Sequence, residues 1–250
     1  MQLNSRNLFF DSSPDSPDSA DPYRFPETAD VHTASESYAG RFVGAVGEWF
    51  LQLQAQTTLS FLADYPGATI LDVGGGHGQT LEPLVQQGYR VTILGSDPAC
   101  NVRIKSFLEA DLCQFQVGNV LDLPYPDQAF DVVISYRFMA HVTQWQQFLQ
   151  ELSRVAKKAV IIDYPTQRSI NAIAPYLFKF KQGLEGNTRP FTCYSEGEII
   201  RHLQNLGLQL DQRHAQFFYP MVLHRALKAA KFSVVLENSV RWTGLTRLLG

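Results

Sequence analysis

The chain has 250 residues, 45% of them hydrophobic and 18% charged, which is the composition of an ordinary globular protein with one main domain. Its net charge of −3 gives no indication of nucleic acid as a partner. Three widely spaced cysteines form neither a disulfide framework nor a zinc pattern, and there is no N-terminal leader and no apolar run of about 18 residues, which favours a protein of the reducing cytoplasm.

The first 34 residues predict a disordered acidic arm. Between residues 11 and 30 the chain carries six acids against a single base, Arg24, and few large aliphatic residues. Such a segment cannot bury enough apolar area to offset the entropy of ordering it. We therefore expect the folded domain to begin at residue 35.

From residue 38 to residue 62, apolar residues recur three and four positions apart, as in an amphipathic helix that caps the fold at its N-terminal end. Ser35 is available as the N-cap. The first half of the stretch is weakened by Gly40, Gly44 and Gly47. The pattern therefore predicts either one long helix or a broken pair.

The next segment is a strand that breaks abruptly into a glycine turn. Apolar residues at 68–73 predict a buried parallel strand, and residues 80–85 resume at helical spacing. Between them the pattern D-x-G-x-G-x-G begins at Asp72 and places glycines at Gly74, Gly76 and Gly78. A ligand can lie against this bare backbone, near the free N–H groups of a helix start.

Two classes of cofactor use such a turn, and the glycine spacing separates them. The dinucleotide fingerprint G-x-G-x-x-G needs a third glycine where Gln79 stands, so a nicotinamide-dependent oxidoreductase is the less favoured alternative. The pattern from Asp72 resembles instead the first motif of the class I S-adenosylmethionine-dependent methyltransferases. The resemblance implies S-adenosyl-L-methionine as the cofactor, held by Asp72 and the three glycines.

A second strand is expected at residues 91–97, and it ends on Asp97. An acid at the carboxyl end of this strand is placed to accept hydrogen bonds from the two ribose hydroxyls of a nucleoside. Asp97 can also cap the helix that Pro98 opens. The two roles are compatible, and the position favours the ribose role.

Residues 115–134 carry a second resemblance. Many small-molecule methyltransferases, including the type that acts in ubiquinone and menaquinone biosynthesis, have the pattern G-D-A-x-x-L-P-F-P-D-x-x-F-D-x-V. This chain has G-N-V-L-D-L-P-Y-P-D-Q-A-F-D-V-V from Gly118. The resemblance implies that Asn119, where relatives often have Asp, accepts from the adenine amino group, and that Val120 donates its backbone N–H to the ring.

A fourth strand runs to Tyr136, a helix follows from Thr143, and a fifth strand lies at 160–165. This alternation predicts an α/β fold, a Rossmann-like, doubly wound, mostly parallel sheet with helices on both faces and ligands at the carboxyl ends of its strands. Tyr136 lies on that rim and is a candidate catalytic residue. His141, in an H-V pair that matches the substrate-facing position of many relatives, is a candidate general base, and the alternative is a packed histidine.

Residues 166–194 are rich in aromatic and basic side chains and predict a lid over the substrate pocket. A capping box opens a further helix at residue 195, and residues 208–218 predict a sixth strand that completes the domain near residue 220. From 221 to 250 a basic tail carries five bases against Glu237 and is expected to be largely helical. The run 232–236 is the candidate for the final antiparallel strand of the resembled fold, and it fits a helical turn equally well.

These motifs together predict an enzyme that methylates a small-molecule or lipid-like acceptor. O-methylation is preferred, because the chain has no Asn-Pro-Pro-Tyr type motif after the fourth strand. The alternative from another class is a scaffold or regulatory domain that binds the cofactor without turnover. The basic tail suits peripheral contact with an anionic membrane, and the favoured alternative is a tail that packs on the sheet with its charges on a solvated face. No histidine spacing indicates a metal site.

Overall fold

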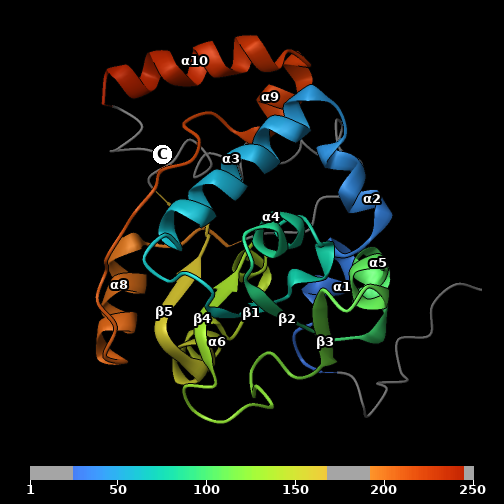
Figure 1. Cartoon of the computed structure of the whole chain (residues 1–250). Coiled ribbons are helices and arrows are strands. Elements are labelled where there is room, and N and C mark those ends of the chain that lie inside the picture. Colours follow the sequence, from blue (N-terminus) through green and yellow to red (C-terminus); the bar gives the residue numbers. More distant parts are fainter. Residues whose placement is uncertain (1–24, 168–191, 245–250) are drawn as a thin grey trace, which may run out of the picture.

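The computed structural model describes residues 25–167 and 192–244, and within them one parallel five-stranded sheet has helices on both faces (Figure 1). Its strand order is β3-β2-β1-β4-β5. The strands are β1 (Thr69–Val73), β2 (Arg90–Gly95), β3 (Cys113–Val117), β4 (Phe130–Ser135) and β5 (Ala156–Ile162). The order reverses between β1 and β4, and ligands of such sheets bind outside the carboxyl ends of the strands at this point. The predicted Rossmann-like fold is confirmed.

Helices enclose the sheet in two layers. They are α1 (Ala29–Thr33), α2 (Glu36–Ala39), α3 (Ala45–Phe61), α4 (Leu81–Gln86), α5 (Lys105–Glu109), α6 (Trp145–Val155), α8 (Glu196–Asn205), α9 (Met221–Leu227) and α10 (Ala230–Trp242). Successive side chains of a strand point to opposite faces. Leu71 therefore packs in the cluster that holds α6 and α8, whereas Ile70 packs in the cluster that holds α4 and the carboxyl end of α3.

The central strand β1 is buried along most of its length, because it pairs with β2 on one side and β4 on the other. Ile70, Leu71 and Val73 are fully buried. A parallel strand covered on both faces needs this nearly continuous apolar sequence. Asp72 is the exception in β1, and its position near the end of the strand makes it the starting point of the site.

The chain from residue 25 onward belongs to the fold, which corrects the prediction of a disordered arm up to residue 34. Two buried carboxylates hold this segment. Asp30 Oδ2 accepts from the Ser96 N–H at 2.6 Å, and Glu27 Oε1 accepts from the Thr143 N–H at 2.7 Å. Hydrogen bonds to charged acceptors are about twice as strong as neutral ones, so they replace the apolar burial that this composition lacks. Residues 1–24 lie outside the described residues.

The predicted helix after Ser35 is a broken pair, α2 and α3. Ser35 Oγ accepts from the Tyr38 N–H at 3.3 Å and caps α2, as predicted. The break lies at Gly44, whose φ of +83° is open to glycine without strain. A Cβ on Gly47 would lie 2.2 Å from the carbonyl carbon of Phe42, so α3 begins in direct contact with the backbone before it.

The predicted sixth strand is wrong, because residues 208–217 have no regular structure. Side-chain contacts hold this segment instead of a β-ladder. Arg213 pairs with Glu196 of α8, and Arg241 Nη2 donates to the Gln216 carbonyl oxygen at 3.2 Å. The run 232–236 lies inside α10, so the helical interpretation of that run is correct.

The predicted basic tail packs on α3 and joins the helical layer at the top of Figure 1. Glu237 of α10 is buried and lies 2.8 Å from His224 Nε2. It also accepts from the N–H groups of Phe218 and Tyr219. Burial raises the pKa of Glu237, but these hydrogen bonds outweigh it and hold the pKa below its usual value.

The anchoring of α1 makes a stability prediction. Asp30→Ala should lower the free energy of unfolding by roughly 1–3 kcal/mol, because it leaves the buried Ser96 N–H without its acceptor. Urea denaturation measures this change. Glu36→Ala is the matched control, since Glu36 is an exposed acid of the neighbouring helix that pairs with Arg103 at the surface, and it should change stability by under about 1 kcal/mol. Equal effects of the two variants would contradict the prediction.

Candidate functional site

The glycine turn follows β1 directly, as predicted. Gly74 and Gly78 have φ values of +77° and +68°, and Gly75–His77 between them form a short 3₁₀ helix. A Cβ on Gly76 would lie 2.3 Å from the carbonyl oxygen of Cys100. The bare backbone at Gly76 is therefore needed for packing against the segment after β2, in addition to any contact with a ligand.

Asp72 lies beneath this turn with 1% of its surface exposed. Its Oδ2 accepts from the Thr80 hydroxyl at 3.1 Å. Burial raises the pKa of Asp72 to about 7, against the opposing effects of the Thr80 hydrogen bond and the charge of Arg137. A Cβ on Gly75 would lie 2.2 Å from the Asp72 carboxyl carbon, so the turn can close over the acid only with glycine there.

Buried polar atoms without a hydrogen-bond partner gather around the turn. They are Asp72 Oδ1, His77 Nε2, Gln79 Oε1 and Arg137 Nη1. Each such atom costs roughly 1–3 kcal/mol, and native proteins contain few of them. Four at one end of a sheet indicate the place of a polar ligand. The residues present thus fit the nucleoside cofactor that the glycine motif predicts.

His77 shapes the turn through a hydrogen bond to the backbone that follows it. Its Nδ1 accepts from the Gln79 N–H at 3.1 Å. Burial and the charges of Arg137 and Arg103 lower the pKa of His77 well below its usual value, so the ring is neutral and carries its proton on Nε2. It can donate to a ligand, but it brings no positive charge.

The two other side chains predicted to contact the cofactor, those of Asp97 and Asn119, already have partners within the chain. Asp97 Oδ1 accepts from the Ala99 N–H at 2.7 Å and caps the 3₁₀ helix Pro98–Ile104, while its side chain stays exposed. The capping role is therefore present, and it leaves the second carboxylate oxygen for a ribose. Asn119 Oδ1 accepts from the Leu121 N–H at 3.0 Å, and Val120 beside it is fully buried.

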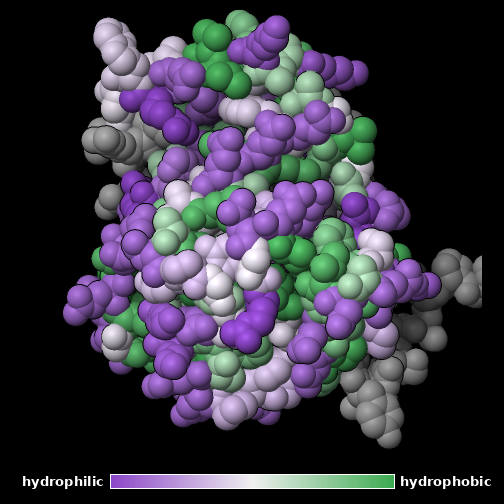
Figure 2. Space-filling view, in the orientation of Figure 1, coloured by the Kyte–Doolittle hydropathy of each residue, from purple (hydrophilic) through white to green (hydrophobic). Residues whose placement is uncertain are grey.

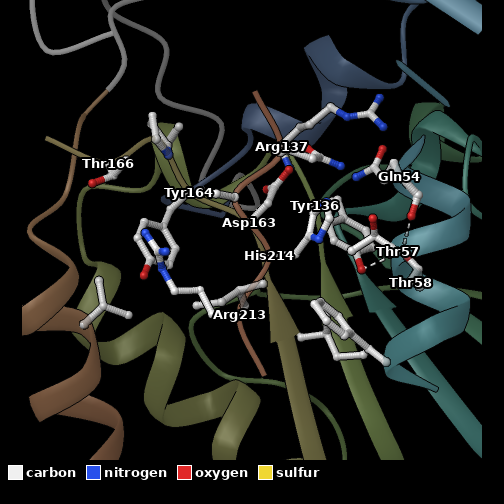
Figure 3. A pocket seen from close by; sticks show the side chains of 18 of the residues that line it. Gln54, Thr57, Thr58, Tyr136, Arg137, Asp163, Tyr164, Thr166, Arg213 and His214 are labelled. Atoms are coloured by element: carbon white, nitrogen blue, oxygen red, sulfur yellow. Dashed lines mark hydrogen bonds between the residues drawn. The ribbon is translucent and has the colours of Figure 1, made fainter. Parts of the chain in front are cut away.

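A cavity of about 870 Å³ opens between β5, α3, α9 and residues 207–217, and Arg137 is among the residues that line it (Figure 3). Its volume suits a small-molecule ligand. Tyr136 and His141, the predicted catalytic residues, both line it. His141 ends the short helix Met139–His141 and is half-buried. Residues 168–191 of the predicted lid lie outside the described residues.

Tyr136 is fixed in the cavity wall by a hydrogen bond between its hydroxyl and Thr58 Oγ1, 2.7 Å apart. The dashed line in Figure 3 marks this contact. Burial raises the pKa of Tyr136 further above its usual value, so the phenol stays protonated. This favours a positioning role for Tyr136 over the role of a proton acceptor.

Arg137 and Asp163 also belong to the site, although the sequence analysis did not single them out. Asp163 follows β5, and its Oδ1 accepts from the Arg137 N–H at 2.6 Å. Burial raises the pKa of Asp163, and the hydrogen bond from Arg137 opposes this. Both follow strands at the rim, so the reasoning that selected Asp97 would also have selected them. Figure 3 shows them side by side on the cavity wall.

The family described as "Methyltransferase domain" matches residues 71–162. The chain is 26% identical over 197 residues to norajmaline N-methyltransferase of Rauvolfia serpentina. The aligned region covers 72% of this chain and 67% of that protein. It is 34% identical over 99 residues to 2-methyl-6-phytyl-1,4-hydroquinone methyltransferase of Synechocystis. Here the aligned region covers 39% of this chain and 31% of that protein.

A solved structure with a similar fold is magnesium protoporphyrin IX methyltransferase from Synechocystis PCC 6803 with bound SAH. Its TM-score is 0.57 at 18% identity, and the match covers 71% of this chain and 85% of that one. At this identity the likeness concerns the fold.

The raised pKa of Asp72 predicts that affinity for S-adenosylhomocysteine depends on pH. If Asp72 binds the ammonium group of the ligand, as expected from the glycine motif, binding needs its carboxylate form, and this form is lost as pH falls below about 7. Affinity should therefore be constant above pH 8 and fall toward about tenfold per unit well below 7. Calorimetric titrations from pH 6 to 8.5 measure this. Asp72→Asn, which keeps an acceptor for Thr80, should remove the dependence, and a flat wild-type profile would contradict the prediction.

Proposed function

Because this chain belongs to the class I S-adenosylmethionine-dependent methyltransferases, whose family model it matches over residues 71–162, we propose that it methylates an oxygen of a small-molecule or lipid-like acceptor. One observation carries the proposal. A cluster of unpaired buried polar atoms at the glycine turn lies next to a large cavity that shares Arg137 with it. The first suits the cofactor and the second suits an acceptor.

The cofactor would be held by residues at the carboxyl ends of the first three strands. Asp72 and the glycine turn would bind its amino-acid end, and Asp97 would accept from the ribose hydroxyls. Asn119 and Val120 would contact the adenine ring. The bound cofactor supplies a methyl group that its sulfonium already activates.

The cavity lining favours an acceptor with an apolar body. Aromatic side chains from α3, β5 and the segment before α9 line it together with bases. The aromatic members include Phe61, Tyr65, Tyr164 and Phe217. One relative is named for norajmaline and another for a phytyl-substituted hydroquinone, both larger than a simple metabolite. O-methylation is preferred because Ser135 and Tyr136 stand where amide and amine methyltransferases carry an Asn-Pro-Pro-Tyr type motif.

Methyl transfer asks the protein to align the acceptor, exclude water and remove a proton. His141 is the group that we propose as general base, because it lines the cavity close in sequence to Tyr136. Tyr136, held by Thr58, orients the acceptor. A scaffold that binds the cofactor without turnover would not need such a cavity. Cys100 and Cys113 are buried cysteines outside any disulfide, and a reducing cytoplasm is the compartment that we propose.

The test is a screen of hydroxylated aromatic and prenylated acceptors for release of S-adenosylhomocysteine. With the acceptor that it identifies, His141→Ala should lower kcat by roughly 10²–10⁴-fold, because proton removal is lost, with little change in the KM for the donor. His202→Ala is the matched control, since His202 lies on α8 and contacts the Gln146 carbonyl oxygen outside the cavity. A loss below about tenfold would return His141 to a packing role.

We also propose that α9 and α10 contact an anionic membrane surface. Neither helix is long and apolar enough to cross a membrane, nor is any other in the described ranges. Large apolar side chains are exposed on this pair, namely Leu223, Leu227, Phe232, Val235 and Trp242. Lys228 and Lys231 are exposed among them, and Figure 2 shows hydrophilic and apolar residues mixed along the upper edge. Each base near an anionic surface contributes about 1 kcal/mol.

Trp242, which is 91% exposed, reports on this contact. Anionic vesicles should shift its emission to shorter wavelength and sediment the chain at low salt, whereas neutral vesicles should do neither. Phe232→Asp with Val235→Asp should abolish both effects. Val102→Asp is the control, because Val102 is 60% exposed on a different surface. A chain that stays in the supernatant with all vesicles would leave a soluble acceptor as the substrate.

A further inference from the structure

We propose that Arg137 binds the carboxylate at the amino-acid end of the cofactor, opposite Asp72, which binds the ammonium group of the same end. The inference rests on the proposed function and names a residue outside the glycine motif and the two other cofactor contacts. Contacts within the chain hold Arg137 in place before any ligand binds.

Two contacts fix Arg137. Its φ of +58° is rare for a residue other than glycine, and such strained backbone persists where the surrounding structure holds it. Here the hydrogen bond from its N–H to Asp163 at 2.6 Å does so. Its guanidinium lies over the ring of Phe42, 4.6 Å from the centroid, which adds a cation–π contact. These contacts therefore hold the Arg137 guanidinium in one position.

At that place Arg137 Nη1 is buried and has no hydrogen-bond partner. A buried cationic donor without an acceptor is costly, so an anion is the partner that it lacks. Arg103 also approaches the turn, but its guanidinium already donates to Glu36 at 2.6 Å and to the His77 carbonyl oxygen at 3.3 Å. His77 is neutral, so it offers no alternative positive charge to a carboxylate.

The second unpaired atom has the opposite charge. Asp72 Oδ1 is buried without a partner on β1, and Asp72 pairs in register with Ile134 of β4, three residues before Arg137. The two charges interact, because Arg137 lowers the pKa of Asp72. A ligand group that carries an ammonium and a carboxylate on one carbon would satisfy both atoms. The amino-acid end of S-adenosylmethionine is such a group, whereas a simple anion would satisfy Arg137 alone.

The test compares ligands that differ in this carboxylate. Calorimetry measures the affinity of wild type and Arg137→Gln for S-adenosylmethionine and for decarboxylated S-adenosylmethionine, which keeps the sulfonium and the ammonium. The substitution should weaken binding of the intact cofactor by roughly 10–100-fold, since charge-assisted hydrogen bonds are lost, and should change binding of the decarboxylated analogue by less than about threefold. Arg137→Lys should lie between, because it keeps the charge and loses the planar fork.

Arg201→Gln is the control, because it removes the same charge from the exposed surface of α8. Circular dichroism and a thermal melt confirm that each variant folds, and Arg137→Lys decides the matter if Arg137→Gln does not fold. Unchanged affinity for the intact cofactor would overturn the inference and leave Arg137 to an anion on the acceptor. An equal loss for both ligands would overturn it in favour of a structural role. A wild-type chain that binds neither ligand would instead refute the proposed function.

Discussion

A buried carboxylate near the end of the central strand is the constraint on which the site depends. Asp72 stands in the middle of the sheet, where both faces are covered and each neighbouring position is apolar. Its burial requires glycine above it, because a side chain at Gly75 would overlap the carboxyl group. The same burial raises its pKa to about 7 and leaves one oxygen without a partner. The glycine at position 75 and one of the unpaired polar atoms of the site thus follow from this single acid.

Buried acids also attach the segments that cover the sheet. Asp30 holds α1 to the end of β2, Glu27 holds the chain before α1 to the start of α6, and Glu237 holds α10 to the segment before α9. In each case the carboxylate accepts from backbone N–H groups that would otherwise lack a partner. A segment attached by a few polar contacts has a lower free energy of local opening than one packed in an apolar core.

The cavity lined by Tyr136 and His141 opens where β5 is the outer strand of the described sheet. Residues 208–217 pass β5 without pairing with it, and the space between them is lined by side chains from both. A paired sixth strand would fill that space. The same arrangement brings Met221 and Val222 of α9 to the cavity, while Leu223 and Leu227 of the same helix face outward. A surface that contacts lipid would therefore lie next to the acceptor site.

Local patterns in the sequence were enough to identify the sheet, the glycine turn, the cap at Ser35 and the acid after β2, since each depends on residues close together in the chain. The contacts of Asp30 with Ser96 and of Tyr136 with Thr58 join residues 66 and 78 positions apart, so no local pattern could reveal them. For the same reason residues 25–34 were mistaken for part of a disordered arm. Residues 208–217 were mistaken for a strand, because their local pattern suits one. The edge of β5 is open, but contacts of Arg213 with Glu196 and of Arg241 with the Gln216 carbonyl oxygen hold this segment without strand pairing. Tertiary structure decided these points, because the free energy of a buried polar group depends on partners that only the folded chain brings together.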